Sequence, residues 1–337
     1  MERGTVPFSR RSRAPTVRIV RDEIWHRQSA AETMSTDIKK SLAGRKIGVL
    51  GKGGAGKSTA VVLLARALVR AGYTVCIVDA DSTNMGLNKA LGIAKPPASL
   101  IEYFGGMIFG GGLVTCPVDD PTLLPGAELV LQEMPSDYVA QAEPHLYLLT
   151  AGKLAQWGAG AGCDGPISKI ARDISVRMDN EPLVTLIDFK AGFEDSARGV
   201  VTGLDWLIAV VDPTQASLAL ASDIKHMVEG VGTGQLPATR HLHDPNLIAL
   251  ANRLYQEARL RGALFVLSRI PDESTESFMR RELAAHDIKP IGTIYEDSTV
   301  ANAWLTGAAL PFPSTSSDLE GIISELEQVA SSSSTTS

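Results

Sequence analysis

The chain has 337 residues, of which 44% are apolar and 21% charged, and its net charge is −6. This composition excludes a wholly disordered chain, and an integral membrane protein is excluded because no apolar run approaches the roughly 20 residues of a spanning helix. A mildly acidic chain also argues against nucleic-acid binding, which depends on neutralising phosphates. Three scattered cysteines favour free thiols in a reducing compartment, so we predict a cytoplasmic protein.

The first part of the chain differs in charge from the rest. Residues 1–46 carry eleven Lys or Arg and five Asp or Glu, a local charge of +6, so the remainder carries −12. We predict that residues 1–45 form a basic disordered extension, with a transit peptide or a translation start at Met34 as alternatives. Residues 46–330 are predicted to form one domain, and residues 331–337 a Ser/Thr-rich tail.

Short β-branched runs alternate with helical patterns along this domain. The predicted strands are Lys46–Leu50, Tyr73–Val78, Leu183–Ile187, Leu204–Val211, Leu264–Leu267 and Ile288–Ile294. The predicted helices are Ser58–Arg70, Pro166–Met178, Ala216–Val228, Asn246–Arg261, Ser274–His286 and Thr299–Leu305. This alternation predicts an α/β fold with a mostly parallel sheet and helices on both of its faces.

Two stretches interrupt the alternation. Residues 100–149 are rich in Gly and Pro and contain two candidate strands, Glu128–Gln132 and His145–Leu149. We interpret this stretch as an excursion that returns to the sheet. Residues 231–246 are predicted to be a surface insertion.

A glycine-rich loop directly follows the first predicted strand and precedes the first helix. Its sequence fits G-x-x-x-x-G-K-[ST], in which successive amides and the start of the helix face a phosphate. Lys57 is placed to reach the β- and γ-phosphates, and the Ser58 hydroxyl to ligate Mg²⁺. The predicted phosphate-binding residues of this loop are Gly51, Lys52, Gly53, Gly54, Ala55, Gly56, Lys57, Ser58 and Thr59.

The second lysine of this loop, Lys52, makes the motif GKGGxGKS. It resembles the deviant Walker A motif of the MinD/ParA/nitrogenase-iron-protein superfamily. The resemblance implies a three-layer P-loop NTPase fold over residues 46–330, ATP as the nucleotide, and a homodimer in which Lys52 reaches the partner's nucleotide. On this reading the protein is an ATPase with slow turnover, and Lys52, Lys57 and Asp81 are its catalytic residues.

Two predicted strands end in aspartates that match the switch loops of this superfamily. The resemblance implies that Asp81 orients the attacking water, that Asp188 with Ser58 holds the magnesium ion, and that the Gly192 amide senses the γ-phosphate. The usual Asn-Lys pair on the adenine side is replaced by Ser268 and Arg269, and Tyr295 is the third residue expected there.

Local segments of the sequence resemble one branch of the superfamily, the CooC-type ATPases, which help to insert nickel into carbon monoxide dehydrogenase. That branch has a Gly-Cys-x-Cys-Pro motif where this chain has Gly162-Cys163-Asp164-Gly165-Pro166. The second thiol is therefore missing. Two Cys163 thiolates across a dimer axis, helped by Asp164, could still bind Zn²⁺ or Ni²⁺ weakly, whereas the alternative for Cys163 is a packing residue. The role of Cys116 stays open.

Three functions follow from the resemblance. The first is a dimeric ATPase that assists metallocofactor or metalloenzyme maturation and has a client metalloenzyme as partner. The second is a MinD/ParA-like positioning ATPase, which the acidic last helix, Asp318–Glu327, disfavours because anionic lipid would repel it. The third is a reductase component like the nitrogenase iron protein, and no cysteine lies between Asp188 and Gly199 to hold its cluster. We predict neither a nucleic-acid nor a membrane partner.

Overall fold

The computed structural model describes residues 41–154, 163–179, 181–193, 195, 199–312 and 316–332. Residues 1–40 of the predicted extension and residues 333–337 of the predicted tail lie outside the described residues. Residues Lys39–Ser337 belong to one compact unit. Within it Leu42, which precedes the first strand, is fully buried.

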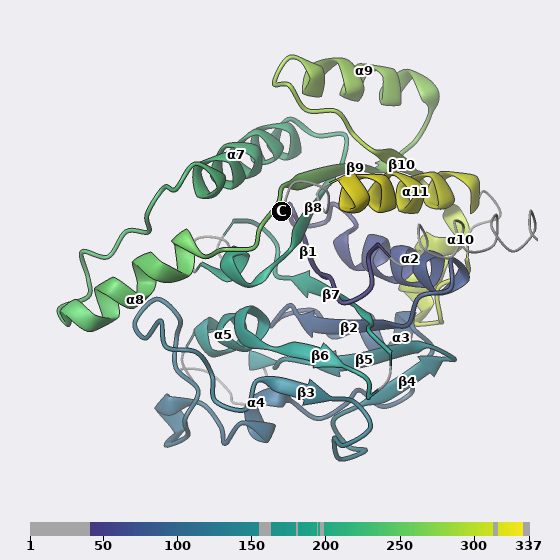
Figure 1. Ribbon diagram of the computed structural model, residues 1–337. Coiled ribbons are helices and arrows are strands. Elements are labelled where there is room, and N and C mark those ends of the chain that lie inside the picture. Colours follow the sequence, from purple (N-terminus) through teal and green to yellow (C-terminus); the bar gives the residue numbers. More distant parts are fainter. Residues whose placement is uncertain are drawn as a thin grey trace, which may run out of the picture. The chain divides into compact units, whose positions relative to one another are not determined.

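An eight-stranded sheet runs through this unit (Figure 1). Its spatial order is β10-β9-β8-β1-β7-β2-β5-β4, and among these strands only the β4–β5 pair is antiparallel. The strands are β1 (Lys46–Gly51), β2 (Val75–Ala80), β4 (Ala140–Glu143), β5 (Leu146–Thr150), β7 (Val184–Phe189), β8 (Trp206–Val211), β9 (Ala263–Ile270) and β10 (Gly292–Tyr295). The prediction of a mostly parallel α/β sheet is confirmed.

Helices cover both faces of the sheet, and each face has its own apolar core. One face packs against α2 (Lys57–Arg70), α3 (Leu87–Ala90), α10 (Ser298–Thr306) and α11 (Ser316–Ser332). The other packs against α4 (Leu100–Tyr103), α5 (Gly165–Asp173), α7 (Gln215–Gly232) and α9 (Glu273–Ala284). Helix α8 (Pro245–Gln256) buries only Ala251. Because both faces are covered, β1, β2, β7 and β8 are buried along their whole length.

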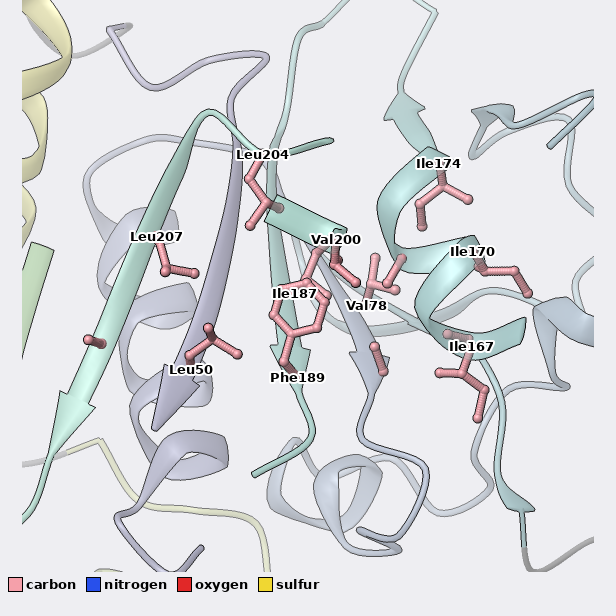
Figure 2. Close-up of a cluster of buried hydrophobic side chains, with 14 of the residues drawn as sticks. Leu50, Val78, Ile167, Ile170, Ile174, Ile187, Phe189, Val200, Leu204 and Leu207 are labelled. Carbon is pink, nitrogen blue, oxygen red and sulfur yellow. The ribbon is translucent and has the colours of Figure 1, made fainter. Parts of the chain in front are cut away.

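Figure 2 shows part of the apolar core on the face that packs against α5, where this core joins the helix to the sheet. Ile167, Ile170 and Ile174 recur every three to four residues, so they share one side of the helix or its end. They belong to the same buried cluster as Val78 of β2 and Phe189 of β7. This packing fixes the start of α5, and with it the Cys163–Asp164 segment just before the helix, against the sheet.

The predicted helix Pro166–Met178 is wrong at its carboxyl end. Helix α5 stops at Asp173, whose carboxylate accepts the Leu124 amide at 2.8 Å, and the next residue is extended. Residues Ser175–Arg177 then form β6, which pairs in parallel with β3 (Glu128–Val130) in a separate two-stranded sheet. The excursion over residues 100–149 therefore returns to the main sheet through β4 and β5, and not through its first strand.

Other predicted boundaries move by a few residues. The predicted strand Ile288–Ile294 begins only at Gly292, because the Ile288 amide still caps α9 by bonding to Leu283 and Pro290 has no amide hydrogen to donate. The predicted helix Asn246–Arg261 ends at Gln256. The predicted surface insertion begins inside α7, which continues to Gly232.

Candidate nucleotide-binding site

The glycine-rich loop connects β1 to α2 at the carboxyl edge of the sheet. Gly56 caps α2 with φ of +89°, a left-handed conformation that favours glycine, and a Cβ there would lie 2.8 Å from Ser268 Oγ. The first amides of α2 therefore open onto a cavity of about 550 Å³ lined by Gly53, Gly54, Gly56, Lys57, Ser58 and Thr59. A helix amino terminus at the wall of a cavity is suited to an anion such as phosphate.

The two loop lysines are held differently. Lys57 is buried, its ammonium lies 3.5 Å from the Lys52 carbonyl oxygen, and desolvation by burial lowers its pKa. Lys52 is partly exposed, and its ammonium forms an ion pair with Asp212 Oδ2 at 3.5 Å. Lys57 thus belongs to the cavity of its own chain. Lys52 must leave Asp212 before it can reach the nucleotide of another chain.

The predicted magnesium ligands lie side by side. The Ser58 hydroxyl donates to Asp188 Oδ2 at 2.7 Å, whereas Asp188 Oδ1 is buried without a hydrogen-bond partner. Burial raises the pKa of Asp188, as does the carboxylate of Asp79, which is its register partner in the neighbouring strand, and together they bring it to about 7. A buried, unpartnered carboxylate oxygen beside a hydroxyl is the hard oxygen donor set that Mg²⁺ prefers. Ser58 and Asp188 therefore fit this ion, which would neutralise phosphate charge there.

Sequence reasoning missed Asn84, which completes this group. Its side-chain amide donates to Ser58 Oγ at 2.8 Å and brings the segment after β2 next to the loop. Asp81 lies in the same segment and lines the cavity. Its Oδ1 accepts the Thr83 amide and the Asn84 amide at 2.9 and 3.2 Å, so the carboxylate also closes its own turn.

Sequence reasoning also missed Lys153, which the structure places beside the first switch segment, residues 81–84 after β2. Its ammonium donates to Asp79 Oδ1 at 2.7 Å in a buried ion pair. Desolvation raises the pKa of Asp79 to about 6, against the opposing charge of Lys153. No periodicity or spacing could have indicated this contact, because it depends on the pairing of β2 with β5, the strand that precedes Lys153.

The second switch segment, residues 190–193 after β7, contacts the phosphate loop through Gly192. Its amide donates to the Gly51 carbonyl oxygen at 3.0 Å. To sense a γ-phosphate, as the sequence predicts, this amide must first break that bond. In this structure the Gly192 amide is therefore engaged with the backbone of the phosphate loop.

The three predicted adenine-side residues line the far wall of the cavity. Ser268 is buried, and Arg269 has φ of +56° and donates to the Gly54 carbonyl oxygen at 2.9 Å. The Tyr295 hydroxyl donates a hydrogen bond to the Glu276 carboxylate, and this bond raises the pKa of Tyr295 to about 12. Sequence reasoning missed Trp304 of α10, whose indole donates to Thr59 Oγ1 at 2.8 Å and closes the same wall.

Cys163 lies away from these walls, at an exposed position, and the Gly158–Gly162 run before it lies outside the described residues. Asp164, expected to help bind a metal, is buried; it accepts from Lys190 Nζ at 3.0 Å and from Ser82 Oγ at 3.5 Å. Among the described residues, no cluster of three or more His, Cys, Asp or Glu side chains could hold a metal ion. Asp164 thus connects the two switch segments.

Cys116 packs where the missing second thiol of the motif would be. A Cβ at Gly165 would lie 2.5 Å from Cys116 Sγ, so only glycine fits beside this side chain. Burial raises the pKa of the Cys116 thiol, and the charge of Cys163 acts in the same direction. Cys163 is two residues before Gly165, so Cys116 packs next to the segment that carries Cys163.

Comparisons with known proteins agree with this geometry. Residues 49–310 match the model of the CobQ/CobB/MinD/ParA nucleotide binding domain. The chain is 33% identical over 190 residues to an uncharacterised ATP-binding protein of Methanocaldococcus jannaschii, covering 56% of this chain and 74% of that protein. It is 31% identical over 191 residues to the carbon monoxide dehydrogenase accessory protein CooC of Rhodospirillum rubrum, covering 56% of this chain and 70% of CooC.

Solved structures show the same fold. The cell division ATPase MinD of Pyrococcus furiosus superposes with a TM-score of 0.51 at 19% identity, over 85% of this chain and 99% of MinD. No helix in the described ranges is both long and apolar enough to cross a membrane. The family match spans the sheet from Val49 of β1 onward and the cavity lining except Asp318 and Leu319. The chain belongs to the CobQ/CobB/MinD/ParA family of nucleotide-binding domains.

Proposed function

We propose that this protein is an ATP-hydrolysing switch that dimerises when it binds ATP. The observation that carries the proposal is Asp188, a fully buried carboxylate with one unpartnered oxygen, bonded to Ser58 at the end of the phosphate loop. Burying such a group costs stability unless a cation completes its environment. An Mg²⁺–ATP complex supplies that cation, and Lys57 supplies positive charge at the phosphates.

Asp81 is proposed to orient the attacking water. It is the aspartate of the first switch segment that lines the cavity, and Asn84 ties this segment to Ser58. Lys52 is proposed to bind the nucleotide of the second chain. Its ion pair with Asp212 is partly exposed, and such pairs are weak enough to exchange for a phosphate.

Phosphate release from ATP tests the proposal. Wild type should hydrolyse ATP slowly with Mg²⁺, and Asp81→Ala should lose most of this activity while its ATP affinity stays within about twofold. The exposed Asp223→Asn on α7 is the matched control and should hydrolyse ATP like wild type. Equal rates in Asp81→Ala and wild type would remove Asp81 from the reaction.

We further propose a CooC-like role in metalloenzyme maturation. It is supported by the 31% identity to CooC and by Cys163, which stands where the resemblance implies a thiolate motif. Because Asp164 is engaged with Ser82 and Lys190, Cys116 is the better candidate for a second ligand to Zn²⁺ or Ni²⁺. Anaerobic purification followed by metal and acid-labile sulfide analysis tests this role, and a metal-free wild type would argue against it.

The two other functions are less well supported. Helix α11 carries no Lys or Arg and several acidic residues, which disfavours MinD-like binding to anionic lipid. A reductase component needs a cluster ligand after Asp188, and the sequence has no cysteine between Asp188 and Gly199. The acid-labile sulfide measurement would also detect such a cluster.

A further inference from the structure

The segment after β5 runs beside the first switch segment and bonds to it repeatedly. The Ala151 amide donates to the Asp79 carbonyl oxygen at 2.8 Å, and the Leu154 amide to the Ser82 carbonyl oxygen at 3.3 Å. Between these two bonds stands Lys153, which is only 6% exposed. A lysine at this depth needs acceptors for all three of its ammonium hydrogens.

Three oxygens of the first switch segment and its strand meet that need. Lys153 Nζ donates to Asp79 Oδ1 at 2.7 Å and to the Asp81 carbonyl oxygen at 2.6 Å, and its third bond is to the Asn84 carbonyl oxygen. Two of the acceptors are backbone atoms of the turn itself. One rigidly held ammonium group therefore spans the turn from residue 81 to residue 84.

Lys153 bonds to the carbonyl oxygens of Asp81 and Asn84, and both of these residues line the nucleotide cavity. Asp81 lines the cavity, and its carboxylate is kept in the turn by the amides of Thr83 and Asn84. The Asn84 side chain donates to Ser58, the hydroxyl bonded to Asp188. A change at Lys153 would thus reach both the proposed water-orienting carboxylate and the magnesium ligand, although Lys153 is absent from the cavity wall.

We propose that Lys153 is a positioning residue, which holds residues 81–84 in the arrangement that hydrolysis requires. The proposal rests on the proposed role of Asp81. Small misplacements of a group that orients a reactant reduce turnover more than they reduce binding. Loss of Lys153 should therefore lower kcat and leave the affinity for ATP nearly unchanged, because Lys57 and the loop amides are untouched.

The experiment separates positioning from stability. Lys153→Met leaves Asp79 buried without its partner, so this variant is paired with the double variant Lys153→Met/Asp79→Asn, which removes the unpaired charge. Asp79→Asn alone is the reference, because Lys153 keeps its two backbone acceptors there. Lys169→Met is the matched control. Lys169 is equally buried, and it donates to the carbonyl oxygens of Asp120 and Thr122, outside the first switch segment.

Two readouts are compared, kcat with KM for ATP, and hydrogen exchange of a peptide covering residues 81–86. We expect kcat to fall about tenfold or more in both Lys153 variants, with KM within about twofold and faster exchange of residues 81–86. The double variant should regain thermal stability without regaining kcat. Asp79→Asn should not show the faster exchange, and its kcat is the reference against which the double variant is compared. Lys169→Met should show neither the faster exchange nor the loss of kcat.

Recovery of both stability and kcat in the double variant would overturn the proposal, as would unchanged exchange of residues 81–86 in Lys153→Met. An equal loss of kcat in Lys169→Met would do the same. The proposed function fails separately. If Asp81→Ala hydrolyses ATP like wild type, Asp81 has no role in the reaction, and Lys153 then positions nothing that the reaction uses even if the exchange result stands.

Discussion

The nucleotide cavity and the Cys163–Asp164 segment are the two regions to which the sequence assigned chemistry, and they differ in how they are built. The phosphate loop and Asp81 line the cavity, and Ser58 of this loop bonds to Asp188, which has a buried oxygen that lacks a partner. In the other region, Asp164 is buried and bonded to both switch segments, and Cys163 is exposed. The first region is therefore arranged to receive a charged ligand, and the second is arranged to connect parts of the chain.

This difference shows that the phosphate-loop motif predicts most of its own site from the sequence, whereas the cysteine motif around Cys163 does not. A phosphate loop is a backbone feature, so the strand, the glycines and the helix are enough to produce it. A metal site depends on side chains from separate segments, and the spacing around Cys163 does not predict that Cys116, far away in the sequence, packs against Gly165 beside it. The following predictions test this contrast, from the largest expected effect to the smallest.

Removal of the cavity's own cation should have the largest effect. Lys57→Ala should lower ATP affinity by at least about 100-fold, roughly 3 kcal/mol, because the phosphates lose a charge fixed inside a desolvated site. Titration calorimetry with Mg²⁺–ATP measures this change. The exposed Lys95→Ala serves as control and should bind ATP like wild type. Unchanged affinity in Lys57→Ala would mean that the nucleotide does not bind in this cavity.

Neutralising Asp188 should stabilise the protein when no metal is present. Because the pKa of Asp188 is raised to about 7, the folded state holds its proton over a pH range in which the unfolded state has lost it. The contribution of Asp188 to the stability of wild type therefore falls as pH rises from about 4 to about 7 and levels off above that. The gain from Asp188→Asn should grow over the same range and reach on the order of 2 kcal/mol at pH 8.

Urea unfolding in a chelator at pH 5, 6, 7 and 8 measures this gain, with Asp223→Asn as the exposed control. Addition of Mg²⁺–ATP should stabilise wild type and not Asp188→Asn. A variant less stable than wild type at pH 8 would show that the unpartnered oxygen of Asp188 costs nothing.

Adding a methyl group at Gly165 should destabilise the second region. The new Cβ would overlap Cys116 Sγ, so Gly165→Ala should cost about 1–3 kcal/mol in urea unfolding. Shortening the neighbour in Gly165→Ala/Cys116→Ala should recover most of that loss. If Gly165→Ala alone were neutral, Cys116 would not be packed against this position.

Replacement of the exposed thiol should have the smallest effect on the fold. Cys163→Ser should change the free energy of unfolding by less than about 0.5 kcal/mol, because the side chain is exposed. If the proposed thiolate site exists, the same variant should lose bound metal by mass spectrometry of the anaerobically purified protein, and so should Cys116→Ser. Equal metal content in wild type and both variants would leave Cys116 as a packing residue and Cys163 without a role in metal binding.

Much of the fold was predictable because buried parallel strands and amphipathic helices leave separate hydrophobic periods in the sequence. The boundary errors have local causes, such as Asp173, which ends α5 by bonding to a loop about fifty residues away. In the candidate site, residues within motifs were predicted and their partners were not. Strand pairing and helix packing bring these partners, Lys153, Asp212 and Trp304, to the motif residues. Such contacts follow no fixed spacing in the sequence, so they could not be predicted from it.

Light scattering in the presence of Mg²⁺–ATP tests the central claim, an ATP-dependent dimer formed through Lys52, most directly. Wild type should change from the mass of one chain without nucleotide to the mass of two chains with ATP, and Asp81→Ala should hold the dimer longer because hydrolysis is slowed. Lys52→Ala should bind ATP and stay at the mass of one chain. The same mass for wild type and Lys52→Ala, with and without ATP, would contradict the account.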